Sequence, residues 1–502
     1  MEQAAAPDPA QAPAQRVYPV IVVGAGFAGL GMAIQLRQAG IDFLLLEKGT
    51  EIGGVWRDNN YPGCGCDVPS ALYSYSFAPN PGWSRFFAQQ GEIKDYTRRT
   101  AQAFGVMDRV RLQHELLAAR WVGDQKLWRL HTSAGVYWAQ FVVMASGPMH
   151  VPVLPPIKGL DTFTGVHFHS ARWDHGYDLR GKRVAVIGSG ASAIQFVPHI
   201  APLVERLTLF QRTAPWVLPK FDPPISKRWQ GIFQKYPWTQ RLLRTVLYLQ
   251  FELLNASLSY PALLKRIQAQ GLKNIARGVK DATLRARLVP DYSIGCKRIL
   301  LSNTWYRALA KPQVQVVGGV AEVQGHKVIS SNGSSCEVDA LIFATGFEVA
   351  NPPIASRIVG LSGTTLAAQW QGSPAAYLGT MAQDCPNLFL TFGPNLYTYS
   401  SAFVILEAQF KFILSAITTA RRKNIAIIAV DPARLASYNS QVQGALQTTV
   451  WNSGCSSYFL DHSGRNTTNW PWTTFTMRRR LGRFLEKHFV TETCSPPAQN
   501  IP

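Results

Sequence analysis

Two glycine-rich segments of the same type, each directly after an apolar run, constrain the fold of this chain more than any other feature. The first is GAGFAG at residues 24–29, which follows VIVV at 20–23. The second is GSGASA at 188–193, which follows VAVI at 184–187. In this strand–turn–helix pattern glycine lets the backbone approach a pyrophosphate, and the helix directs free N–H groups at the phosphates. The pair predicts an α/β fold with two Rossmann-like dinucleotide-binding domains.

The residue that ends the next strand differs between the two segments and separates the nucleotides they bind. After the first segment, FLLL at 43–46 leads to Glu47, whose carboxylate suits a ribose hydroxyl and repels a 2′-phosphate. After the second, LTLF at 207–210 leads to Arg212 and Thr213, and a guanidinium suits a 2′-phosphate. We therefore expect FAD or NAD at the first site and NADP at the second. The turn residues expected to contact these cofactors are Gly24, Gly26, Gly29, Gly188, Gly190, Ser192 and Ala193.

Composition is typical of a large soluble enzyme. The chain has 502 residues, of which 47% are hydrophobic and 16% charged, and no apolar run reaches the roughly 20 residues that span a bilayer. The seven cysteines are irregularly spaced and odd in number, which favours a reducing compartment, and we expect a cytoplasmic protein. Cys64 and Cys66 form a C-x-C pair without further ligands nearby, so we expect two small turn residues and no metal site. The absence of a C-x-x-C or C-x-x-x-x-C pair argues against a dithiol mechanism.

Residues 223–290 carry half of the net charge of +20, because they include twelve Lys or Arg residues and two acidic residues. The same segment contains apolar residues at helical spacing between positions 242 and 254. Two interpretations stay open: a helical insertion packed on the enzyme with a solvated basic face, or a surface that makes a weak contact with anionic lipid or attracts NADPH. Membrane association is therefore an alternative to a purely cytoplasmic location. No recognition motif accompanies the charge, so we expect no nucleic-acid partner.

Two further apolar runs that end in small residues, FVVMASG at 141–147 and ALIFATG at 340–346, mark crossings between the domains. They indicate that the first nucleotide domain is interrupted by the second and then resumes. The predicted division is a tail at 1–16, a first part of the FAD-binding domain at 17–155, an NADP-binding domain at 156–345 that includes the helical insertion at 223–290, a second part of the FAD-binding domain at 346–490, and a tail at 491–502.

The segment before the second fingerprint carries a resemblance to a known family. Residues 163–174 fit the pattern F-x-G-x-x-x-H-x-x-x-W-[PD], and here the chain resembles the Baeyer–Villiger monooxygenases. The resemblance implies that NADPH reduces FAD, that reduced flavin captures O₂ as a C4a-peroxyflavin, and that a ketone becomes an ester or lactone. The alternative is oxidation of sulfur or nitrogen centres, as in the related flavin-containing monooxygenases. An uncoupled NADPH oxidase or a nucleotide-binding interaction module is a third hypothesis.

The same resemblance implies roles for particular residues. GGVW at 53–56 resembles a flavin-side segment and brings in Gly54 and Trp56, while YPGCGCD at 61–67 ends on the family's active-site aspartate, Asp67. CKR at 296–298 resembles the family's K-R pair, which implies that Lys297 holds the NADP phosphate and that Arg298 reaches the flavin. We expect Arg298 to stabilise developing negative charge and Asp67 to orient it. Tyr458 stands where relatives usually have tryptophan; neither the ketone nor the oligomeric state is indicated.

Overall fold

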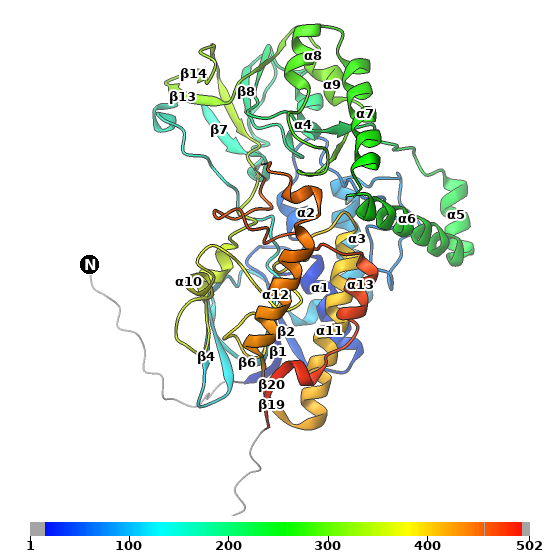
Figure 1. The fold of residues 1–502 in the computed structure, drawn as a ribbon, viewed down its shortest axis with the longest axis vertical. Coiled ribbons are helices and arrows are strands. Elements are labelled where there is room, and N and C mark those ends of the chain that lie inside the picture. The colour runs from blue at the N-terminus through cyan, green and yellow to red at the C-terminus, as the bar shows by residue number, and fades with distance from the viewer. Residues whose placement is uncertain (1–15, 259, 456, 494–502) are drawn as a thin grey trace, which may run out of the picture.

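The computed structural model describes residues 16–258, 260–455 and 457–493, and contains a separate sheet for each glycine-rich segment (Figure 1). The first sheet has the order β17-β4-β5-β6-β1-β2-β3, with β18 also paired to β6. Its parallel centre joins β1 (Val17–Val23) to β2 (Phe43–Leu46) and to β6 (Gly135–Met144). Its other strands are β3 (Val110–Arg111), β4 (Leu116–Val122), β5 (Leu127–Thr132), β17 (Ile358–Val359) and β18 (Leu388–Leu390).

The second sheet is parallel throughout, in the order β12-β9-β8-β16-β7. These strands are β7 (Val166–His169), β8 (Arg183–Ile187), β9 (Arg206–Phe210), β12 (Val314–Val317) and β16 (Ala340–Phe343). Beside it lie an antiparallel sheet of β13 (Val320–Gln324), β14 (Lys327–Ser330) and β15 (Ser335–Glu337), and a short pair of β10 (Val217–Leu218) with β11 (Leu300–Leu301). The apolar runs become fully buried strands because helices and loops cover both faces of a parallel sheet. The expected α/β class with two Rossmann-like folds is confirmed.

Both glycine turns need glycine for the same steric reasons. Gly24 and Gly188 have φ of +104° and +103°, and a Cβ on either would lie 2.5 Å from a carbonyl oxygen of a neighbouring strand end. Gly29, in the first turn of α1 (Phe27–Gln38), lies against Gly24, and its Cβ would stand 1.8 Å from the Gly24 oxygen. The turns therefore direct the N-termini of α1 and α4 (Ala193–Ile200) at the space beyond the carboxyl ends of the strands.

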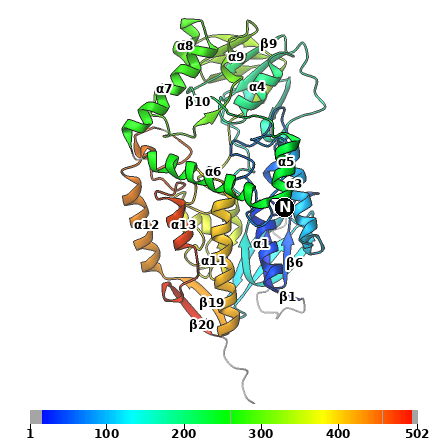
Figure 2. The same cartoon turned by 90° about the vertical axis from the view of Figure 1, so that its right-hand side faces the viewer.

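The helical insertion expected at residues 223–290 consists of α5 (Lys227–Lys235), α6 (Pro237–Ser257), α7 (Pro261–Gly278) and α8 (Ala282–Leu288). The long helix α6 leaves the second-sheet half and lies over the half that contains the first sheet, with α5 at its outer end (Figures 1 and 2). Its contacts confirm this placement, because Gln240 Nε2 donates to the Asn80 oxygen at 2.7 Å and the Thr474 nitrogen donates to Glu252 at 2.9 Å. The insertion therefore bridges the two halves of the molecule.

After β16 the chain returns to the first sheet and adds a helical layer. The central helix is α11 (Ala402–Lys423), which packs so closely on α1 that a Cβ on Gly31 would stand 2.5 Å from the Phe410 ring. Among the described residues α11 is the helix long and apolar enough to cross a membrane, but 61% of its apolar window is buried in the core. The remaining helices are α2 (Val55–Asp58), α3 (Gln90–Ala103), α9 (Trp305–Leu309), α10 (Leu366–Trp370), α12 (Pro432–Leu446) and α13 (Thr474–Arg480). The remaining strands are β19 (Ile425–Val430) and β20 (Phe489–Thr493). Short 3-10 turns lie at Val106–Arg109, Leu160–Thr162, Ser170–Arg172, Pro353–Arg357, Val450–Asn452 and Glu486–His488.

One predicted boundary differs from the structure. A tail is expected from residue 491, whereas β20 continues to Thr493 because it pairs antiparallel with β19. Most of the expected N-terminal tail lies outside the described residues, although Arg16 is placed and forms an ion pair with Asp42 at 2.6 Å. The other domain boundaries stay predictions.

Candidate active site

Asp67 and Arg298 are far apart in the sequence, and they form a bidentate ion pair between the two halves of the molecule. Arg298 donates from Nε to Asp67 Oδ2 at 3.0 Å, and from Nη2 to Oδ1 and Oδ2 at 2.6 Å each. The Arg298 side chain is 26% exposed and the Asp67 side chain is 23% exposed, so the pair is sheltered but still borders open space. The planar fork of the guanidinium matches the carboxylate, which fixes the direction of Arg298 as well as its charge.

The surroundings keep both partners charged. Burial raises the pKa of the Asp67 carboxyl, but attraction and hydrogen bonding by Arg298 outweigh burial and hold this pKa below its ordinary value. Burial likewise lowers the pKa of Arg298, and the Asp67 charge outweighs it, so that the pKa lies well above the ordinary arginine value. The pair therefore presents a permanent, oriented cation at any pH near neutrality.

Two tyrosines that the sequence reasoning missed hold Arg298 in place. The Tyr399 hydroxyl accepts a hydrogen bond from the Ile299 nitrogen at 3.2 Å and donates to the Lys297 oxygen at 3.0 Å, so it holds the backbone on both sides of Arg298. The Tyr397 hydroxyl accepts a hydrogen bond from Nη1 of Arg298. The sequence offers one signal, the Gly-Pro-Asn turn at 393–395, which comes just before these residues.

Tyr458 lies beside this arrangement in the C-terminal segment. Burial raises the pKa of both Tyr397 and Tyr458, and the Arg298 charge acts on both in the opposite direction. The position where relatives usually carry tryptophan therefore lies close to Arg298 and Tyr397.

A disulfide links the same two segments and corrects an expectation. The irregular cysteine spacing favours a reducing compartment, in which disulfides are rare, but the structure pairs Cys296, next to Lys297, with Cys455. Cys64, Cys66, Cys336 and Cys385 are free, and Cys494 lies outside the described residues. Burial raises the pKa of the Cys64 thiol to about 12, so this cysteine is an uncharged packing residue, as expected for the C-x-C turn. Among the described residues no three His, Cys, Asp or Glu side chains gather as a metal site would require.

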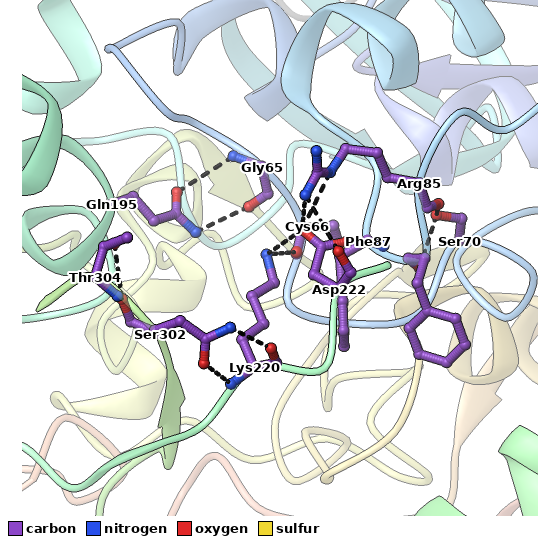
Figure 3. A network of polar contacts seen from close by, with 12 residues as sticks. Gly65, Cys66, Ser70, Arg85, Phe87, Gln195, Lys220, Asp222, Ser302 and Thr304 are labelled. Carbon is purple, nitrogen blue, oxygen red and sulfur yellow. Dashed lines mark hydrogen bonds and ion pairs between the residues drawn. The ribbon is translucent and has the colours of Figure 1, made fainter. Parts of the chain in front are cut away.

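A network of polar contacts at the junction of the two halves holds the segment that carries Asp67 (Figure 3). Gln195 donates to the Gly65 oxygen at 3.0 Å and accepts from the Gly65 nitrogen at 3.3 Å. Lys220 reaches the Cys66 oxygen at 3.4 Å, and its charge helps to lower the pKa of Asp67. Asp222 accepts from Arg85 at 3.1 Å. The position of Asp67 is therefore set from both sides of the junction.

The motif residues at the junction have packing roles. His169 Nδ1 accepts from the Ala171 nitrogen at 3.1 Å, and burial lowers the pKa of His169 to about 4, so the imidazole is neutral at pH 7. The Trp173 ring lies 5.1 Å from Phe196 and 6.5 Å from Tyr61, which belong to different halves of the molecule. This arrangement supports a structural role for both residues of the 163–174 pattern.

The first glycine turn forms a narrow backbone cradle. A Cβ on Gly54 would stand 3.0 Å from the Gly26 Cα, so two glycines face each other where the FAD pyrophosphate is expected. Behind them Glu47 is 4% exposed. Its carboxylate accepts hydrogen bonds from the backbone nitrogens of Ala25 and Gly49 and from Nη1 of Arg57, each at 2.8 Å. Each carboxylate oxygen has more than one acceptor site, so a ribose hydroxyl can still be accommodated. Trp56 is buried close by and donates to the Tyr73 hydroxyl at 3.0 Å. The cradle fits FAD.

The second glycine turn is open, and two cations stand near it. A Cβ on Gly190 would meet nothing within 4 Å, which leaves its backbone free to face a phosphate. Burial and the nearby charge of Arg212 lower the pKa of Lys297, so the fold brings these two predicted residues together despite their repulsion. Neither forms an ion pair within the described part of the chain, and Lys297 lies 4.6 Å over the Tyr292 ring. Two unneutralised cations fit a 2′-phosphate.

The smaller residues predicted for the second site differ in their surroundings. Ser192 precedes the first residue of α4 and its side chain makes no capping hydrogen bond; it lies beside Tyr61, and its hydrogen bond lowers the pKa of that tyrosine, although burial raises this pKa overall. Ala193, the first residue of α4, is fully buried and allows the close approach of helix and sheet. The Thr213 oxygen accepts from the Ser189 hydroxyl at 3.1 Å, which closes the turn around the site. Contact of any of these residues with a cofactor stays a prediction.

Comparisons with known proteins identify the family of this chain. The family model of pyridine nucleotide-disulphide oxidoreductases matches residues 21–236. A Baeyer–Villiger monooxygenase of Streptomyces coelicolor is 46% identical over 473 residues, which are 92% of this chain and 91% of the relative. One of Pseudomonas aeruginosa is 43% identical over 487 residues, 95% of this chain and 92% of the relative.

Solved structures give the same answer. A steroid monooxygenase bound to NADP aligns with a TM-score of 0.84 at 27% identity, covering 95% of this chain and 99% of its own. OTEMO in complex with FAD and NADP aligns with a TM-score of 0.85 at 27% identity, covering 94% and 97%. The chain belongs to the Baeyer–Villiger monooxygenases.

Proposed function

We propose that this enzyme uses FAD, NADPH and O₂ to insert one oxygen atom next to the carbonyl of a small-molecule ketone, giving an ester or lactone. Family membership supports the reaction class. The observation that carries the proposal within this chain is the oriented cation Arg298, held by Asp67 at 2.6 Å between the two glycine turns. Bound FAD supplies the electron transfer from NADPH and the activation of O₂; the protein supplies binding, orientation and charge.

Each nucleotide has a set of residues that would hold it. FAD would lie along the first turn, with its pyrophosphate over the closely packed backbones of Gly26 and Gly54 and its ribose at Glu47. NADPH would lie along the second turn, with its pyrophosphate at Gly190 and its 2′-phosphate between Arg212 and Lys297. The two nucleotides would meet at the junction where Asp67 and Arg298 lie, each reaching it from its own half of the molecule.

Arg298 would stabilise negative charge on the ketone oxygen as the carbonyl carbon becomes tetrahedral. A guanidinium is suited to this because it keeps its proton and its five N–H donors lie in a fixed plane. Asp67 occupies Nε and Nη2, and Tyr397 accepts from Nη1, so the direction of the fork is set before the substrate arrives. Preorganised charge of this kind commonly contributes a factor of about 10² to 10³ in rate.

The test is turnover of a panel of cyclic, linear and aryl ketones and one thioether by the FAD-loaded enzyme with NADPH. We expect esters or lactones from the wild type, and their loss in Arg298→Ala while NADPH still reduces the flavin. Arg180→Ala is a matched control, since Arg180 is an exposed arginine paired with Asp178 away from the junction. Sulfoxide or hydrogen peroxide as the only products would overturn the proposal and favour sulfur oxidation or an NADPH oxidase.

Several finer points stay predictions. We infer that the chain divides at residues 155 and 345, which the distribution of strands over the two sheets supports. The cytoplasmic location stays a prediction, and the Cys296–Cys455 disulfide weakens the cysteine argument for it. A membrane contact through residues 223–290 also stays a prediction. The basic character of this segment gives no support to a nucleic-acid partner.

A further inference from the structure

Helix α6 carries an unusual stripe of exposed apolar side chains. Trp238, Leu242, Val246, Leu249 and Leu253 are all exposed, with Trp238 at 63% and Leu253 at 72%. Their spacing of three or four residues places them within an arc of about 80° on one face of an α-helix. The stripe runs along most of the helix, so it is a continuous surface and not a scatter of single exposed residues.

The opposite face of α6 is fastened by hydrogen bonds, which fixes the stripe outward. Arg244 donates from Nη1 to the oxygens of Ala71, Leu72 and Ser74 at 2.9 to 3.1 Å. Asn255 Oδ1 accepts from the Thr398 hydroxyl at 2.8 Å and from the Tyr399 nitrogen at 3.0 Å. Rotation of α6 to bury the stripe would break these contacts together with those of Gln240 and Glu252. The apolar face therefore stays available to an external partner.

The charges around the stripe are positive. Between residues 223 and 280 the sequence contains one acid, Glu252, which is buried and bonded to Thr474. The exposed cations of α5 and of the start of α6 are Lys227, Arg228, Lys235 and Arg241. Two exposed aromatic side chains, Trp229 and Tyr236, lie among these cations. An apolar stripe bordered by cations and aromatic rings matches the boundary between lipid headgroups and acyl chains.

We propose that α5 and the outer face of α6 dock this enzyme on an anionic membrane surface. The helix lies on the membrane and does not span it, because its other face is committed to the protein. Charge excludes the main competing occupant: a second copy of this chain would bring two segments of the same strong positive charge together, whereas anionic lipid neutralises them. Figure 1 shows α5 and the outer end of α6 at the right-hand edge of the molecule, and Figure 2 shows α6 crossing the face of that side, where a planar surface can reach it.

The test is co-sedimentation of the FAD-loaded enzyme with vesicles of phosphatidylcholine alone or with 30% phosphatidylglycerol, a composition chosen for the assay, at low salt. We expect binding to the anionic vesicles and its loss at high salt, because screening weakens the cationic part. The double variant Leu242→Ser/Leu249→Ser should lower the partition coefficient by at least about ten-fold. The variant Lys227→Gln/Arg228→Gln should lower it about five-fold for each cation removed.

Matched controls make the outcomes distinct. Leu203→Ser/Leu361→Ser removes two leucines of similar exposure elsewhere on the surface and should leave vesicle binding unchanged. The measurement needs no turnover, so it stands apart from the proposed reaction. Absence of binding to anionic vesicles, or binding that the α6 variant leaves intact, would overturn the proposal. A dimer in analytical ultracentrifugation that the α6 variant dissociates would overturn it in favour of a second copy.

Discussion

Replacing Arg298 by alanine should leave Asp67 as an uncompensated charge and make the stability of the enzyme depend on pH in a new way. In the wild type the folded-state pKa of Asp67 lies below its unfolded value of about 3.9, so the pair contributes stability above that pH and loses it as the pH falls further. Without Arg298, burial becomes the dominant influence and raises the folded-state pKa of Asp67 above 3.9. The variant is then destabilised at neutral pH, and the destabilisation lessens as Asp67 takes up a proton on acidification.

The magnitude follows from the geometry of the pair. Removing one partner of a fully buried ion pair costs about 3 to 5 kcal/mol. Here about a quarter of each side chain is exposed, so water screens part of this cost. We therefore expect the free energy of unfolding to fall by roughly 2 kcal/mol. The entropy of unfolding is about 2 cal/mol/K per residue, or about 1 kcal/mol/K for the whole chain, which gives a fall in Tm of about 2 °C.

The assay is thermal unfolding of the wild type, Arg298→Ala, Asp67→Asn and the double variant at pH 8 and pH 5.5. We expect the deficit of Arg298→Ala to be larger at pH 8 than at pH 5.5, and the double variant to recover part of it because the uncompensated charge is gone. A deficit that is equal at both pH values, or additive effects in the double variant, would refute the reasoning that the two side chains form one charged unit.

Three further outcomes are expected. Replacing Arg212 or Lys297 by alanine should raise the KM for NADPH more than ten-fold and leave that for NADH nearly unchanged; equal effects on both would contradict the 2′-phosphate assignment. Tyr399→Phe should lower kcat roughly ten-fold at constant KM for NADPH, because two hydrogen bonds that hold the backbone beside Arg298 are lost, and an unchanged kcat would show that they do not position it. Cys455→Ser should lower Tm by about as much as dithiothreitol does in the wild type, since either breaks the bond to Cys296, and a further effect of dithiothreitol on the variant would point to another disulfide.

The nucleotide turns could be predicted from the sequence because their physics is local. Each consists of a strand, a turn that requires positive φ at Gly24 or Gly188, and the helix that follows, all within about twenty residues. The opposed charges of Glu47 and Arg212 are equally local, since each ends the strand after its turn. For the same reason the apolar runs at 43–46 and 207–210 appear in the structure at the expected strands, β2 and β9.

The details of the site depend on tertiary contacts and could not be predicted in the same way. Cys296 and Cys455 are 159 residues apart, and only the fold brings their Cα atoms to 6.4 Å. Tyr399 follows a Gly-Pro-Asn turn in the sequence, but the direction of its hydroxyl depends on the segment around Arg298, about a hundred residues away. The sequence could not predict which face of α6 is exposed either. Both faces of this helix contain apolar residues, and only packing shows which one is covered.

The most direct test of the proposed reaction is a turnover under ¹⁸O₂ with NADPH and a ketone from the panel, followed by mass spectrometry of the product. If the enzyme inserts one atom of molecular oxygen next to the carbonyl, the ester or lactone will carry a single ¹⁸O at the ring or chain position, and none when the label is supplied as water. NADPH consumption matched by labelled hydrogen peroxide, with the ketone recovered unchanged, would contradict it.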